Sequence, residues 1–170
     1  MASRGADRGG RRAPVPLDAT CAAAGCDAPR DRLLAIQLLA LLPALAAALR
    51  ACGFRRVYTA LGRMSARRAR RGAGRGAGAA ECVAAVVVHV NRHALPYQSK
   101  CLLESLSLWF LLRRRGFPAD LVLGARTLLG PLEAHAWVEL DGRVLNDTAD
   151  VRDVYEPFSL GSIAPGPGSR

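Results

Sequence analysis

Three side chains in the second half of the chain could together break a peptide bond. Cys101 stands at the expected start of a helix, His135 lies in an expected strand, and Asp147 lies in the strand after it. A thiolate can attack a carbonyl carbon, an imidazole can take and return the proton, and a carboxylate can hold the imidazole's tautomer. Cysteine is also a common buried residue, so Cys101 alone would not indicate catalysis.

The position of Cys101 favours a reactive thiol. Ser99 can serve as the N-cap of a strongly amphipathic helix over 100–115, which a Gly and a Pro then end. Free N–H groups and the positive end of the helix dipole lower a thiol pKa and can stabilise an oxyanion. We expect the oxyanion donors to be the Cys101 backbone N–H and a side chain just upstream, Gln98 or Tyr97.

His135 lies in a segment whose residues alternate as in a half-buried strand. Apolar residues occupy one set of alternate positions, and the other set is Glu133, His135, Trp137 and Glu139. A histidine between two carboxylates and a tryptophan differs from an ordinary core histidine, although a surface role also fits this pattern.

The loop after this strand decides which acid can reach His135. The pair Asp-Gly at 141–142 is typical of a hairpin turn. With a two-residue loop, Asp147 would point to the apolar face, away from His135. With a three-residue loop, Glu139 would pair with Arg143, and Asp147 would lie opposite His135 with Cβ atoms about 5 Å apart. We therefore predict the three-residue loop; the alternative acids are Asp141, Asp150 and Asp153.

The rest of the chain predicts one α+β domain. A length of 170 residues with 51% apolar residues allows a proper core and excludes a wholly disordered chain. We expect a helical N-terminal segment, then a helix packed on a small antiparallel sheet that carries His135 and Asp147. The expected strands span 119–126, 132–140 and 143–147. The expected regions are a disordered basic tail at 1–30, a helical apolar and basic lead-in at 31–66, a Gly/Ala/Arg linker at 67–80, a catalytic domain at 81–160 and a flexible tail at 161–170.

An uncharged apolar run of 17 residues spans Leu33–Leu49. It is at the short limit for crossing a bilayer and contains Pro43. We expect a buried or partner-facing helix that is kinked near Pro43, capped by Asp31 and ended by Gly53, with attachment to a membrane surface as the alternative.

Two groups of residues could suggest a metal site, and neither has the required pattern. His89 and His93 are four residues apart, but Val90 stands where a zinc protease needs its glutamate. Cys21 and Cys26 have no nearby His or second Cys pair to complete a zinc site. We expect no metal, and a structural role for the two histidines.

Charge is distributed unevenly along the chain. The whole sequence has a net charge of +10, but residues 1–80 hold 15 Arg and four Asp, whereas the remainder is close to neutral. A basic first half could dock on RNA or an anionic membrane. Its only aromatic residues are Phe54 and Tyr58, too few for base stacking, which disfavours nucleic acid.

Two stretches resemble a known enzyme family: PYQSKCLLESLSLWFLLRRRGFPADLVLGAR and AHAWVELDGRVLND. They are similar to the transglutaminase-like, papain-type catalytic domain of lasso-peptide leader peptidases, over roughly residues 85–160. Carried over residue by residue, the resemblance places the family's triad on Cys101, His135 and Asp147. It implies a cysteine peptidase that removes the leader from a ribosomally made precursor before macrolactam closure, without a metal or nucleotide cofactor.

The resemblance also implies partners. Residues 1–80 show no strands like those of the fused leader-recognition domain, which indicates the split form of the enzyme. A separate winged-helix-like recognition protein would then deliver the precursor leader, and an ATP-dependent macrolactam cyclase would use the product. Five cysteines are too few for a disulfide scaffold, which favours the cytoplasm, with membrane association through 33–49 as an option. The competing hypotheses are a transglutaminase-like acyltransferase or amidase with the same triad, and a non-catalytic basic binding module.

Overall fold

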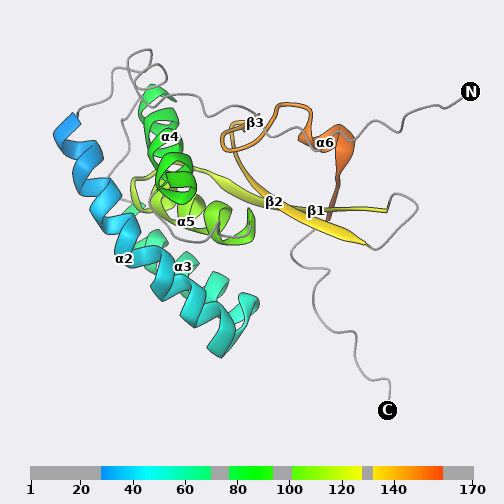
Figure 1. Cartoon of the computed structure of the whole chain (residues 1–170), viewed down its shortest axis with the longest axis horizontal. Helices are drawn as coiled ribbons and strands as arrows, with labels where there is room; N and C mark the ends of the chain where they lie inside the picture. Colours follow the sequence, from blue (N-terminus) through cyan, green and yellow to red (C-terminus); the bar gives the residue numbers. More distant parts are fainter. Residues whose placement is uncertain (1–27, 70–76, 94–100, 128–131, 159–170) are drawn as a thin grey trace, which may run out of the picture.

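The computed structural model describes residues 28–69, 77–93, 101–127 and 132–158, and these form a mixed α+β fold. Figure 1 shows helices α2 to α5 gathered at one end of the molecule and the sheet at the other. The helices are α2 (Ala28–Cys52), α3 (Phe54–Ala69), α4 (Ala77–His93), α5 (Cys101–Arg114) and α6 (Val151–Val154). The strands are β1 (Asp120–Arg126), β2 (Glu133–Leu140), β3 (Arg143–Val144) and β4 (Glu156–Phe158).

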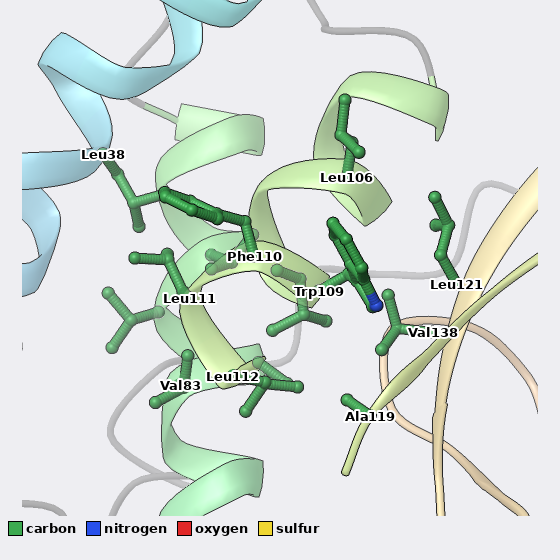
Figure 2. Close-up of a cluster of buried hydrophobic side chains, with 14 of the residues drawn as sticks. Leu38, Val83, Leu106, Trp109, Phe110, Leu111, Leu112, Ala119, Leu121 and Val138 are labelled. Atoms are coloured by element: carbon green, nitrogen blue, oxygen red, sulfur yellow. The ribbon is translucent and has the colours of Figure 1, made fainter. Parts of the chain in front are cut away.

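Helix α5 is the centre of the core. It contacts α2, α3 and α4 as well as strands β1 and β2, and its residues 105–112 are all buried. In Figure 2, side chains of α5 meet Leu38 of α2 on one side and Val138 of β2 on the other. The expected amphipathic character is therefore wrong, because helices cover one side of α5 and the sheet covers the other. The expected stop is confirmed: Gly116 has φ 90°, and the Phe117 N–H donates to the Leu112 carbonyl.

Helix α2 packs one face on this core and exposes the other. Four leucines at helical spacing are buried, namely Leu34, Leu38, Leu42 and Leu45. The exposed face includes Leu33, Ile36 and Leu39. The segment Arg32–Cys52 is long and apolar enough to cross a membrane by length and composition. Because one face is packed on the protein, those two properties alone do not make it a membrane span.

The ends of α2 differ in how well they follow the sequence pattern. The helix begins at Ala28, so Asp31 lies inside it and is not its cap. It continues through Pro43 without interruption. Gly53 ends it as expected, with φ 77° and an N–H that donates to the Leu49 carbonyl.

Helices occupy both ends of the segment expected to be a linker. Helix α3 continues to Ala69, and α4 already begins at Ala77, within the expected linker 67–80. Alanine and arginine are strong helix formers, so a Gly/Ala/Arg composition does not by itself end a helix. Helix α4 buries Val83, Val87 and Val90 in the core.

The sheet has four antiparallel strands in the order β3-β2-β1-β4. Two expected strands are present with nearly the expected bounds. The third, expected over 143–147, is only the two residues of β3, so Asp147 lies beyond the sheet. Strand β4 was not expected, because Glu-Pro-Phe is short and contains a proline, which sheets admit at an edge.

The face of β2 that carries His135 is covered more than its polar residues suggest. Trp137 is fully buried and Glu139 is nearly so. The Trp137 indole N–H donates to Glu139 Oε1 at 2.7 Å, and Arg152 of α6 makes two hydrogen bonds to the same carboxylate. These contacts lower the pKa of Glu139, the Arg152 pairing most. A buried carboxylate thus ties α6 to the middle of the sheet.

Candidate active site

Cys101 is the first residue of α5 and is a half-buried free thiol. Its side chain lies close to His135 and to the backbone of Ala136 and Leu102. The pKa of Cys101 is lowered from its ordinary value, chiefly by the interaction with His135, against the opposing effect of burial. The geometry therefore favours a thiolate beside an imidazolium.

His135 lies between this thiol and a carboxylate. Its Nε2 atom pairs with Asp147 Oδ2, and both side chains are about a quarter exposed, at 23% and 25%. The Asp147 contact, followed by the Cys101 contact, raises the pKa of His135 to about 9. The structure thus brings together the three side chains singled out in the sequence, while their catalytic roles stay a prediction.

The imidazole is also supported by rings on its own face of the sheet. The Tyr155 ring stacks on His135 with centroids 4.8 Å apart, and the ring of Trp137, two residues further along β2, lies with its centroid 6.2 Å away. Gly124 of β1 pairs with His135 across the sheet. A Cβ at Gly124 would come within 2.8 Å of the Trp137 ring and 3.0 Å of Tyr155 Cβ. The missing side chain of Gly124 therefore makes room for the rings beside His135.

Sequence reasoning missed Tyr155 and Gly124. A glycine inside a strand pattern often marks a close approach of other groups, so Gly124 carried a usable signal. Tyr155 carried no such signal. It lies between α6 and β4, and only the tertiary fold brings its ring onto His135.

The predicted hairpin register is wrong. Leu140 pairs with Arg143, so the loop has two residues, Asp141 and Gly142, with φ 51° and 78°. Two left-handed residues form the turn that matches the right-handed twist of the strands, and Asp-Gly suits it. The contact between His135 and Asp147 nevertheless exists, because the chain leaves the ladder before strand alternation can fix the direction of Asp147.

The remaining expected site residues have different places. Gln98, Tyr97 and the expected cap Ser99 lie outside the described residues. Asp141 is in the hairpin turn, whereas Asp150 and Asp153 are at or in α6 and exposed. Within the ranges that the structure describes, no group of three or more His, Cys, Asp or Glu residues is arranged to hold a metal.

Comparison with known proteins identifies a family for this chain. The family model of the transglutaminase-like superfamily matches residues 41–159, a range that contains Cys101, His135 and Asp147. The chain belongs to the transglutaminase-like superfamily. The chain is also 38% identical over 68 residues to the microcin J25-processing protein McjB of Escherichia coli. The match covers 40% of this chain and 30% of that relative. No solved structure is significantly similar to the chain.

Proposed function

We propose that this transglutaminase-like protein is a cysteine peptidase that removes the leader from a lasso-peptide precursor. The observation that carries the proposal is the continuous contact from the Cys101 thiol through His135 to Asp147 at the start of a helix. Similarity to a protein that processes microcin J25 supports a peptide substrate. The quoted motifs around Cys101 and His135 support the leader peptidases in particular.

In the first step, the Cys101 thiolate attacks the carbonyl carbon of the bond between leader and core. The sulfur–carbon bond forms, and the carbonyl oxygen carries the negative charge. We assign its stabilisation to the Cys101 backbone N–H together with Gln98 or Tyr97. As the oxyanion re-forms the carbonyl, the carbon–nitrogen bond breaks and the amine nitrogen takes a proton from His135. Because Nε2 of His135 is held by Asp147, this proton comes from Nδ1.

In the second step, water replaces the amine. His135 takes a proton from the water as it attacks the thioester, and the sulfur leaves as a thiolate. Asp147 keeps the imidazole oriented and stabilises its protonated form throughout. If an amine replaces this water, the same residues perform acyl transfer instead of hydrolysis.

We also propose the molecular setting of this reaction. A separate winged-helix-like recognition protein delivers the precursor leader, and an ATP-dependent macrolactam cyclase uses the new N-terminus. We propose the cytoplasm as the location of the reaction, since such a cyclase needs ATP. The exposed apolar face of α2 is compatible with a membrane surface or with one of these proteins.

The test is mass spectrometry of a lasso-peptide precursor incubated with the protein and the proposed recognition protein. The proposal predicts one cut at the leader boundary with wild type and with Cys52→Ala, an exposed free thiol far along the chain from the site, and no cut with Cys101→Ala. A precursor that stays whole with wild type contradicts the peptidase. A product carrying an added amine in place of a free carboxylate would establish acyl transfer.

A further inference from the structure

One side chain, Asn146, touches the elements that carry all three residues of the candidate triad. We propose that Asn146 is a positioning residue that sets Asp147 against His135 by replacing a backbone partner in the sheet. The inference deepens the proposed function and rests on it for the catalytic meaning of that contact.

The first argument is the hydrogen-bond ladder beyond β3. The Leu145 N–H donates to the Val138 carbonyl at 2.9 Å, as the observed register requires. A regular ladder would then return the Val138 N–H to the Leu145 carbonyl. That N–H instead donates to Oδ1 of Asn146 at 2.8 Å. A side chain thereby satisfies the backbone N–H of Val138 in β2. The main chain after Leu145 can then turn away from the ladder, so that Asp147 reaches His135.

The second argument is the helix that carries Cys101. The Asn146 amide nitrogen donates to Ser105 Oγ at 2.9 Å and to Glu104 Oε1 at 3.3 Å, both on α5. Ser105 in turn donates to the Ala136 carbonyl of β2 at 2.8 Å. Asn146 and Ser105 thus bind the N-terminal part of α5 to the edge of β2 beyond its pairing with β3.

Contacts on both sides hold this amide and its loop in place. The Asn91 amide of α4 donates to the other oxygen of Glu104 at 2.5 Å, which fixes the carboxylate that accepts from Asn146. After Asp147, the Thr148 N–H donates to Asp147 Oδ1 at 2.7 Å, leaving Oδ2 for His135. The short segment between β3 and α6 is therefore held on both sides. Asn146 is bound near its start, and Arg152 of α6 pairs with Glu139 after its end.

A merely structural asparagine would affect folding without changing the protonation of His135. A positioning role predicts that the pKa of His135 falls when Asn146 is replaced, because Asp147 is the largest cause of its elevation. Among the described residues, the other groups that raise its pKa or stack on it are Cys101 and the Tyr155 and Trp137 rings. None of them is a hydrogen-bond partner of Asn146, which binds Val138, Ser105 and Glu104. Glu133, two residues before His135 on β2, is paired with Arg126.

The experiment is an NMR titration of His135 in the substrate-free protein, assigned against His135→Asn. The variants are Asn146→Ala and Asn146→Gln, which keeps the amide but moves it by one methylene. Asp147→Asn gives the value without the carboxylate. Leu42→Ala, in the core of α2, is the matched control for lost stability.

We expect the His135 titration in both Asn146 variants to move from about 9 toward the value in Asp147→Asn, with no movement in Leu42→Ala. An unmoved titration in a folded Asn146 variant overturns the proposal; if Asn146→Ala does not fold, Asn146→Gln decides. On the precursor, the variants should lower kcat by at least tenfold with little change in KM. Because the titration needs no substrate, a shifted pKa in a protein that cuts nothing would refute the proposed function alone.

Discussion

Two regions of the molecule are stabilised by different kinds of contact. One is the helical end, and the other is the edge of β2 beyond the two residues that pair with β3. Helices α2 to α5 meet through buried leucines, valines and aromatic rings. Figure 2 shows part of this cluster, with side chains from α2, α4 and α5. At the edge of β2, the strand's backbone groups are paired with side chains from Asn146 and Ser105. Apolar contacts tolerate small shifts, whereas hydrogen bonds depend on distance and direction. Changes at the helical end should therefore cost stability, and changes at the edge should cost activity.

The largest expected effect is at the nucleophile. Cys101→Ala should abolish turnover, since no other group replaces the sulfur–carbon bond, while the melting temperature changes little for a half-buried side chain. Thermal unfolding followed by circular dichroism, beside the cleavage assay, separates the two. Residual cutting at the wild-type position would mean that Cys101 is structural.

The next effect is at the acid. Asp147→Asn should lower kcat by about 10⁴-fold, as loss of the orienting carboxylate does in other triads. The fold should survive, because Asp147 lies in a partly exposed loop. Steady-state kinetics with the precursor measure this loss. A change below tenfold would exclude Asp147 as the orienting group and return attention to the neighbouring acids.

A smaller effect is expected from pH. Protonated His135 must supply the proton to the leaving amine, and its pKa is about 9. Turnover should hold through neutral pH and fall about tenfold per unit as pH rises above 9. The acid limb should follow the lowered pKa of Cys101. In Asp147→Asn, the basic limb should move to lower pH; an unchanged limb would assign it to another group.

The smallest effect on activity should come from the helical end. Leu42→Ala removes a fully buried side chain and should lower the free energy of unfolding by about 2–5 kcal/mol. At a temperature where the variant stays folded, kcat/KM should match wild type. Urea unfolding and cleavage assays compare the two quantities. A large loss of kcat/KM without unfolding would show that the two regions are coupled.

The same contrast explains what could be predicted from the sequence. Helix stops at Gly53 and Gly116 follow from local chemistry, and the structure has both. The proximity of His135 and Asp147 was also predicted, but from a wrong hairpin register. The register argument assumed that Asp147 stays on a strand. It leaves the sheet because Asn146 takes over a backbone bond, and no residue periodicity contains that information.

Burial on the sheet was equally hard to predict. Trp137 and Glu139 alternate with apolar residues as solvent-facing positions do, yet both are buried. Glu139 accepts from the Trp137 indole and is paired with Arg152, which returns from α6. This contact joins α6 to β2, two segments that only the tertiary fold brings together. Local patterns therefore singled out side chains that the structure brings together, and they described the surroundings of those side chains less well.

The most direct test of the central claim is the pH dependence of Cys101 alkylation by iodoacetamide, followed by mass spectrometry of the Cys101 peptide. A thiolate paired with His135 predicts fast alkylation well below pH 9, with a midpoint that rises in Asp147→Asn as the imidazolium is lost. Cys52 in the same sample reports an exposed thiol outside the site. A single midpoint near pH 9 for Cys101, unchanged in Asp147→Asn, would contradict an activated nucleophile at this site.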